Sequence, residues 1–342
     1  VCLPIILIVS AFACFTASGG APRASIYMGR DDMDSAEKTL GGCFTLQIGI
    51  SVVLTAALLL WGRDALLAFG ASENTIDYAA DYLHIYAFGT LFVELTLGMN
   101  AFITAQGFAK VGMYTVLIGA AANIVLDPIF IFVFGWGVRG AAAANVTAQL
   151  LSAIWIVWFL SSGRSAIRLH PQAIRFGRII VPVLTLGLAP FIMQITECLI
   201  NVVFNVGLQR YGGDDYITSI TIITSLMQIV SVLTSGFQQG IQPIIGFNFG
   251  ARSMDRVRQA VRMAFATQIV SATVLVSMLA AFPGFFASWF TSKQDVIDIV
   301  TAMMPIFVSG WGIFGIQMGA QCALVGMGQA RQSIFLAIFR KV

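Results

Sequence analysis

The sequence predicts an all-α protein that crosses a membrane many times. Of its 342 residues, 58% are hydrophobic and only 10% are charged, whereas a soluble globular domain carries about 25% charged residues. The mean hydropathy is +0.87. Apolar runs of the roughly 20 residues that a helix needs to span a bilayer recur along the whole chain. We therefore expect a polytopic helical membrane protein.

We expect ten membrane-spanning helices, of which the first and the last are partial. The first apolar run occupies residues 1–26, and the last begins near Ser333 and continues to Val342. The complete spans between them are 40–61, 78–105, 111–134, 138–160, 179–208, 216–247, 261–286 and 297–325.

Basic residues divide the predicted loops into two alternating sets. Fourteen Lys and Arg residues lie in one set and four in the other. Cytoplasmic loops of membrane proteins carry the excess of Lys and Arg, so the richer set should face the cytoplasm of a cell whose plasma membrane, the inner membrane in bacteria, holds the protein. The cytoplasmic loops are then 29–39, 106–112, 161–178, 248–262 and 327–342.

The two halves of the chain repeat each other at a spacing of 221 residues. The matched pairs include Pro22 and Pro243, Gly29 and Gly250, Met33 and Met254, Asp34 and Asp255, and Phe69 and Phe290. Both halves of such a repeat have the same orientation, because the matched loops are on one side. We predict two parallel six-helix bundles, with an amino-terminal bundle at 1–160, a cytoplasmic linker at 161–178 and a carboxy-terminal bundle at 179–342.

The repeat also predicts that the chain is a fragment. When the span 179–208 is mapped back by one repeat, its counterpart falls before residue 1. The spans 111–134 and 138–160 map forward to positions mostly beyond Val342. We therefore expect about ten of twelve spans, without the first helix and the carboxy-terminal end.

A carboxylate and an amide lie inside the span 111–134. Asn123 and Asp127 are four residues apart, so they share one face of a helix. Pro128 removes a backbone donor and invites a bend. A carboxylate at bilayer depth costs at least about 2.5 kcal/mol and usually marks a functional site. The alternative is a carboxyl that only holds helices together through neighbouring amides.

Several segments resemble the multidrug and toxic compound extrusion (MATE) family, in the bacterial branch that includes the staphylococcal multidrug exporter. They are Gly19-Gly20-Ala21-Pro22, Ala105-Gln106-Gly107-Phe108-Ala109-Lys110, Asn123-Ile124-Val125-Leu126-Asp127-Pro128, Gly135-Trp136-Gly137-Val138-Arg139-Gly140 and Gln242-Pro243-Ile244-Ile245-Gly246-Phe247-Asn248-Phe249-Gly250. The resemblance covers essentially the whole chain and is strongest through 123–148 and 238–262.

The resemblance implies a transporter, not an enzyme, with two six-helix bundles around a central cleft. It implies export of amphiphilic, often cationic drugs by antiport against Na⁺ or H⁺. No cofactor other than the coupling ion is expected. The implied partners are small organic cations and the lipid bilayer, without nucleic acid, and we expect a monomer.

The resemblance also implies a cation site in the amino-terminal half. Asn123 and Asp127 match an Asn-x-x-x-Asp pair on the fifth family helix, and they are the ligands expected for a possible Na⁺. Eighteen residues after the Asp the family usually has Thr, whereas this chain has Asn145, with Thr147 as a possible substitute. The family completes the site with an Asp on its first helix, which this chain is expected to lack.

A second set of polar residues lies inside the predicted spans. Glu197 follows Pro190 by seven residues, and some family members carry a cation-coupling Glu in this helix shortly after a proline. Gln194, Asn201 and Asn205 flank it at helical spacing, so we expect a stripe that lines the substrate cleft or bonds between helices. Glu94, mid-span, is equally consistent with the cleft and with packing. Gln242 is a further candidate for the cleft.

Two other functions have less support in the sequence. A lipid-linked oligosaccharide flippase of the same superfamily would need several cationic residues to hold pyrophosphate, and Arg23 is the lone candidate within the spans. A membrane enzyme would need a nucleophile, a metal site or an acid–base pair. The five cysteines and two histidines are scattered without metal-binding spacing.

Overall fold

The computed structural model describes residues 2–69, 75–170, 177, 179–211 and 213–339. Within the helices, the side chains of residues 198, 201–211, 213–215, 217 and 311–313 lie outside the description. All regular secondary structure in the described residues is helical. Eight of these helices are long and apolar enough to cross a membrane. The protein is therefore a multi-pass helical membrane protein.

The first half of the chain folds into five long helices and one π-helix. These are α1 (Leu3–Gly29), α2 (Met33–Ala68), α3 (Ile76–Ala105), α4 (Ala109–Pro128), η1 (Ile129–Val133) and α5 (Gly137–Ser161). Each long helix corresponds to one predicted span. The best-buried side chains join α1, α2, α3 and α5 around Leu40, Met99 and Phe102, so α3 forms the centre of this bundle.

The second half departs from the predicted spans at two places. Its helices are α6 (Ile180–Tyr211), α7 (Gly213–Gly250), α8 (Met254–Ala281), α9 (Pro283–Ala287), α10 (Gln294–Val308), α11 (Trp311–Gly326) and α12 (Ala330–Phe339). The predicted span 261–286 ends at Ala281, because Pro283 begins a separate short helix, and proline favours the first position of a helix. The predicted span 297–325 is interrupted at Ser309 and Gly310.

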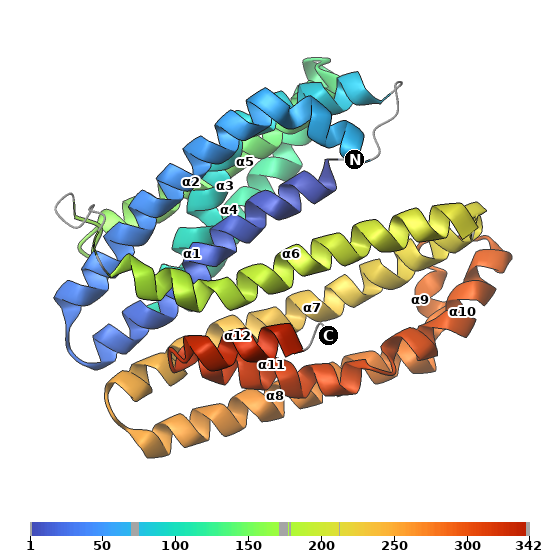
Figure 1. Cartoon of the computed structure of the whole chain (residues 1–342). Helices are drawn as coiled ribbons and strands as arrows, with labels where there is room; N and C mark the ends of the chain where they lie inside the picture. Colours follow the sequence, from blue (N-terminus) through green and yellow to red (C-terminus); the bar gives the residue numbers. More distant parts are fainter. Residues whose placement is uncertain (1, 70–74, 171–176, 178, 212, 340–342) are drawn as a thin grey trace.

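The two halves meet at one end of the molecule, here called the closed end (Figure 1). A Cβ atom added to Gly29 would lie 2.0 Å from the Phe247 carbonyl oxygen, and one added to Gly250 would lie 2.1 Å from that of Ile26. Gly29 and Gly250 are partners in the 221-residue repeat, so the contact between α1 and α7 is reciprocal. Only glycine permits such close approach of two backbones.

A second reciprocal contact joins α1 to α6. A Cβ atom on Gly19 would lie 2.0 Å from the Val183 carbonyl oxygen, and one on Gly187 would lie 1.9 Å from that of Phe15. Phe191, one turn further along α6, packs against Phe15 with ring centroids 5.1 Å apart. Small residues at these crossings allow helices in a membrane to pack closely.

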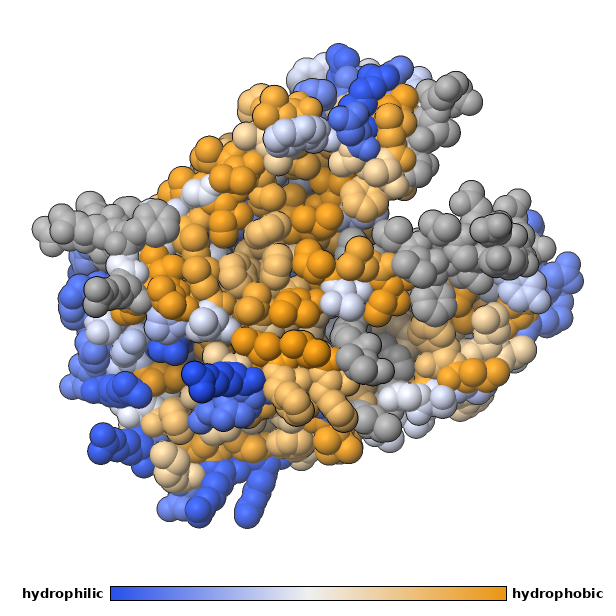
Figure 2. Space-filling view, in the orientation of Figure 1, coloured by the Kyte–Doolittle hydropathy of each residue, from blue (hydrophilic) through white to orange (hydrophobic). Residues whose placement is uncertain are grey.

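Beyond these contacts the two halves diverge toward the opposite, open end. Figure 1 shows α1 and α2 separating from α6 and α7 toward the start of α3 and the α6–α7 connection. The space-filling view is notched at the same end (Figure 2). The structure is therefore closed where α1 meets α6 and α7, and open at the other end.

The predicted cytoplasmic loops gather at the closed end. Residues 162–170 begin the predicted linker, and their backbone folds back onto the amino-terminal bundle. The side-chain Oε1 of Gln106 accepts hydrogen bonds from Ser165 Oγ at 2.9 Å, Ala166 N at 2.8 Å and Ile167 N at 3.1 Å. Most of the remaining predicted linker lies outside the described residues.

Candidate functional site

Asp127 lies where the hydrogen-bonding pattern of its helix changes. The α-helical pattern of α4 ends at Pro128 and continues as the π-helix η1. Phe134 N donates to the Ile129 carbonyl at 2.9 Å, a bond that spans five residues instead of four. Proline has no backbone N–H for the usual α-helical bond. The irregularity expected at Pro128 is therefore present, and π-turns of this kind are frequent at functional sites.

The start of α5 packs tightly against η1. A Cβ atom on Gly140 would lie 2.6 Å from the Phe130 carbonyl oxygen. This approach brings α5, and with it Asn145, alongside the end of α4 that carries Asp127. Asn123, Asp127 and Asn145 are all half-buried.

Tyr82 of α3 connects two of the predicted site residues. Its phenol oxygen is hydrogen-bonded by the Asn145 side chain and lies within electrostatic range of the Asp127 carboxylate. Three helices, α3, α4 and α5, therefore contribute a phenol, a carboxylate and an amide to one place. The sequence analysis missed Tyr82, although Tyr78, Tyr82 and Tyr86 recur every four residues on α3.

Thr147, the possible substitute for Asn145, is engaged elsewhere. Its hydroxyl donates to the Ala143 carbonyl at 2.7 Å, within its own helix. Of Asn145 and Thr147, Asn145 is therefore the one that contacts Tyr82. Asn123 occupies the same face of α4 as Asp127, one turn earlier. The oxygens offered here are those that hard cations such as Na⁺ prefer.

The polar residues of α6 begin where α6 parts from α1. Phe191 contacts Phe12 with ring centroids 5.0 Å apart. Gln194, one turn closer to the open end, is half-buried, and Glu197 is exposed. The side chains of the other two members of the predicted stripe, Asn201 and Asn205, lie outside the described residues.

The other two cleft candidates, Glu94 and Gln242, differ in burial. Glu94 has no exposed surface and is packed within the amino-terminal bundle, so it does not line an open cleft in this structure. Gln242 is half-buried, and its carbonyl oxygen would lie 3.2 Å from a Cβ atom on Gly326. That contact places the Gln242 backbone at the interface of α7 with α11, near the closed end.

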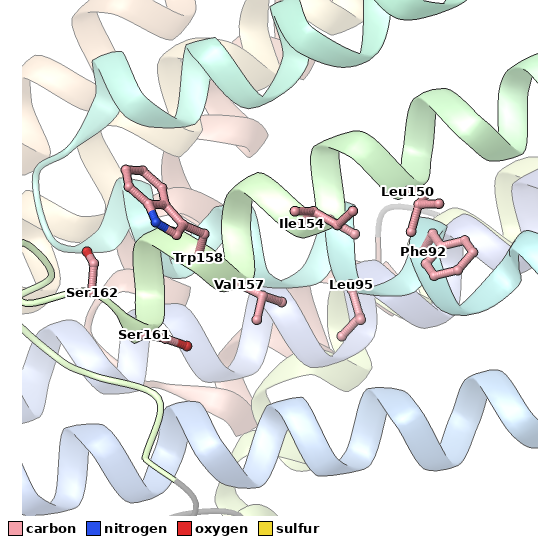
Figure 3. A pocket seen from close by; sticks show the side chains of 9 residues that line it. Phe92, Leu95, Leu150, Ile154, Val157, Trp158, Ser161 and Ser162 are labelled. Carbon is pink, nitrogen blue, oxygen red and sulfur yellow. The ribbon is translucent and has the colours of Figure 1, made fainter.

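A separate apolar groove of about 620 Å³ runs between α3 and α5 (Figure 3). Figure 3 shows Trp158, Ile154 and Leu150 along α5, with Ser161 and Ser162 at the end of the groove. The remaining lining residues are Phe92, Leu95, Ala153 and Val157. None of the predicted site residues lines this groove, and both of its helices belong to the amino-terminal bundle.

Comparison with protein families and curated proteins gives concordant matches. The sequence model of the MatE family matches residues 1–129 and 190–342. The multidrug export protein MepA of Staphylococcus aureus is 23% identical over 343 residues, which cover 99% of this chain and 75% of that protein. MepA of Staphylococcus haemolyticus is 22% identical, covering 98% of this chain and 74% of that protein.

Solved structures share the arrangement of helices. A MATE multidrug transporter, DinF-BH, solved as a complex, superimposes with a TM-score of 0.91 and is 29% identical, covering 99% of this chain and 76% of that one. An outward-facing MATE family transporter of the MOP superfamily also gives a TM-score of 0.91, with 21% identity and the same coverage. The latter match shows the fold alone.

Proposed function

Because this chain belongs to the MatE family, we propose that it exports drugs and other toxic small molecules in exchange for an inward-moving Na⁺ or H⁺. The protein is a transporter and not an enzyme. Its relatives named MepA are multidrug export proteins, and the similar DinF-BH is a multidrug transporter. Both likenesses extend over nearly the whole of this chain.

The observation that carries the coupling proposal is the convergence of Asp127, Asn145 and Tyr82. A carboxylate at bilayer depth costs at least about 2.5 kcal/mol unless a partner stabilises it. Here the Asp127 carboxylate lies within electrostatic range of the Tyr82 phenol, which in turn contacts the Asn145 side chain on a neighbouring helix. A Na⁺ ion bound by these oxygens, or a proton on the carboxylate, would offset that cost. Asn123 supplies a further amide oxygen on the same face.

The site lies near the open end of the molecule. Tyr82 is six residues from the start of α3, which is about 9 Å along the helix. The closed end holds the loops with most of the basic residues, so we assign it to the cytoplasm. A cation from outside would then reach Asp127 in the open state shown here.

A transporter of this kind alternates between a state open to the outside and a state open to the cytoplasm. Cation binding drives export only by favouring one of these two states. A ligand shifts a conformational equilibrium by its differential affinity for the two states. Asp127 adjoins the junction of α4 and η1, where the hydrogen-bonding pattern changes. We place the coupling there: neutralising Asp127 changes how this junction packs against α5, and with it the shape of the cleft.

The cleft between the halves suits amphiphilic organic cations. Where α6 leaves α1, Phe191 is followed along the helix by the half-buried Gln194 and the exposed Glu197, and we assign this segment to the cleft. Aromatic faces attract organic cations, and the carboxylate adds an opposite charge. Arg23 is the one basic residue in the interior of the first helix, so the chain has little to bind a pyrophosphate.

Uptake of a fluorescent cation such as ethidium into inverted membrane vesicles tests this proposal. A pH or Na⁺ gradient should drive uptake by the wild-type protein, and Asp127→Asn should abolish it at unchanged expression. Asp64→Asn is the matched control, since Asp64 is an exposed carboxylate at the open end of α2. Full gradient-driven uptake by Asp127→Asn would exclude Asp127 as the coupling residue.

A further inference from the structure

A polar ladder lies between α2 and α3 in the middle of the amino-terminal bundle. Thr55 and Thr90 share a hydrogen bond of 2.6 Å between their hydroxyl groups. The amide of Gln47 lies across Gly98, where an added Cβ atom would come within 1.3 Å of the amide nitrogen. These two contacts are the two ends of the ladder.

Glu94 occupies the middle of this ladder. The two helices run antiparallel (Figure 1), so moving one turn from Gln47 along α2 corresponds to moving one turn back from Gly98 along α3. That step pairs Ser51 with Glu94, and the next pairs Thr55 with Thr90. Glu94 and Gln47 are both completely buried, and Ser51 is 1% exposed. The carboxyl is thus enclosed in the bundle.

Oxygen atoms without donors surround this position. Both carboxylate oxygens of Glu94 and Oε1 of Gln47 are buried and have no hydrogen-bond partner among the described residues. The nearby hydroxyl protons are already used. Ser51 donates to the Ile48 carbonyl at 2.8 Å, and Thr90 donates to the Ala87 carbonyl at 2.8 Å. Among the described residues, these two hydroxyl groups therefore keep no free proton for a bare carboxylate, and neither Glu94 oxygen has a hydrogen-bond partner.

Helix α1 closes the third side of the site without adding a positive charge. Thr16 Oγ1 donates to the Ala13 carbonyl at 3.0 Å and accepts a hydrogen bond from Gln47 Nε2 at 2.7 Å. Cys14 lies within electrostatic range of Glu94. The nearest basic residue on α1 is Arg23, nine residues from Cys14 and so about 13 Å along the helix.

The other packed helices supply no counter-charge either. Among the described residues of α2, α4 and α5, the basic side chains lie only near the helix ends: Lys38 and Arg63 in α2, Lys110 in α4 and Arg139 in α5. Tyr86, one further titratable group near Glu94, is on the same helix. A buried charge is normally paired or coordinated. The site offers oxygen atoms and no positive charge, so it suits a cation that oxygen atoms can bind.

We propose that Glu94, together with Gln47 Oε1, forms a second cation-binding site, which holds a proton or a Na⁺ ion inside the amino-terminal bundle. A proton on Glu94 would turn one oxygen into a donor for the Gln47 carbonyl. A Na⁺ ion would instead be bound by the carboxylate and amide oxygens, with Ser51 and Thr16 offering hydroxyl oxygens.

This site is separate from the one at Asp127. Tyr82 marks the level of Asp127 on α3, and Glu94 is twelve residues further along, or about 18 Å toward the closed end. The second site goes beyond the proposed coupling at Asp127 and does not depend on it. A cation there would sit midway between the two ends of the bundle.

The test measures cation binding in the purified protein that carries Asp127→Asn, so that the first site is silent. One arm measures saturable binding of radioactive Na⁺ at high pH. The other records pH-difference infrared spectra, which report the C=O stretch of a protonated carboxyl. We expect one of the two signals in Asp127→Asn and its loss, at least tenfold for Na⁺ affinity, when Glu94→Gln is added.

A stability check on Glu94→Gln and one further variant guard against misfolding. Glu94→Gln keeps the shape of the side chain, and size-exclusion profiles and melting temperature should match those of the parent. Gln47→Leu removes the amide oxygen together with the Nε2 donor to Thr16, and it should weaken Na⁺ binding or shift the carboxyl band without abolishing it. Equal signals in Asp127→Asn and in the double variant would overturn the second site. That result would leave transport by the wild-type protein, and so the proposed function, untouched.

Discussion

The reciprocal glycine contacts predict that a single methyl group will open the closed end. In Gly250→Ala the new Cβ would lie 2.1 Å from the Ile26 carbonyl oxygen, about 1.3 Å nearer than the 3.4 Å at which ordinary contact begins. Overpacking of this kind typically costs about 1–3 kcal/mol. The penalty applies only to the state in which α1 and α7 touch, so the closed-end contact should become about 5- to 150-fold less populated relative to states that separate the helices.

Distances between spin labels at Asp34 and Asp255 measure this shift. Both residues are exposed and are partners in the repeat. They lie in the first turns of α2 and α8, next to the ends of α1 and α7 that form the closed end. Gly250→Ala should lengthen the distance distribution and slow drug export at least fivefold. Gly240→Ala is the matched control on the same helix, because its Cβ would meet no atom within 4 Å. Unchanged distances in Gly250→Ala, or the same change in both variants, would refute the tight closure described here.

Two smaller changes test other parts of the structure. Tyr82→Phe removes the phenol oxygen that Asn145 contacts. One hydrogen bond is worth about 1 kcal/mol, so the change should weaken the cation dependence of transport roughly fivefold with little effect on drug affinity. An unchanged cation titration would count against a role of Tyr82 in the cation site. Gln106→Ala leaves the N–H groups of Ala166 and Ile167 without their acceptor, whereas Ser165 Oγ keeps the Ile167 carbonyl at 2.6 Å. It should destabilise the protein by about 1–3 kcal/mol, seen as a lower melting temperature in detergent, whereas Gln239→Ala, at an exposed position, should not.

The helical architecture could be read from the sequence because its signal is strong and local. Long apolar runs specify membrane helices regardless of their neighbours, and each of the first eight predicted spans has a matching helix. The 221-residue repeat reappears as the reciprocal contact of Gly29 with Phe247 and of Gly250 with Ile26. The breaks at Pro283 and at Gly310 were missed, because an apolar run continues through both.

The site was only partly predictable. The pair Asn123 and Asp127 follows from helical spacing. Tyr82 instead connects Asp127 with Asn145 across three helices, and spacing along one chain segment does not reveal such a contact. Glu94 shows the same limit more clearly. Its charge marks it in the sequence, but the register of α2 against α3 decides that it faces Gln47 and Ser51 instead of the cleft. Burial of a polar residue depends on tertiary packing.

The most direct test of cation coupling is gradient-driven transport in proteoliposomes with a fluorescent cationic drug on both sides. An imposed Na⁺ or H⁺ gradient should drive drug accumulation by the wild-type protein, and reversing the gradient should reverse its direction. Asp127→Asn should retain drug binding within about twofold, since the residue is assigned to the cation site and not to the cleft, while gradient-driven accumulation is lost. Accumulation by Asp127→Asn that equals the wild type would contradict the coupling role assigned to Asp127.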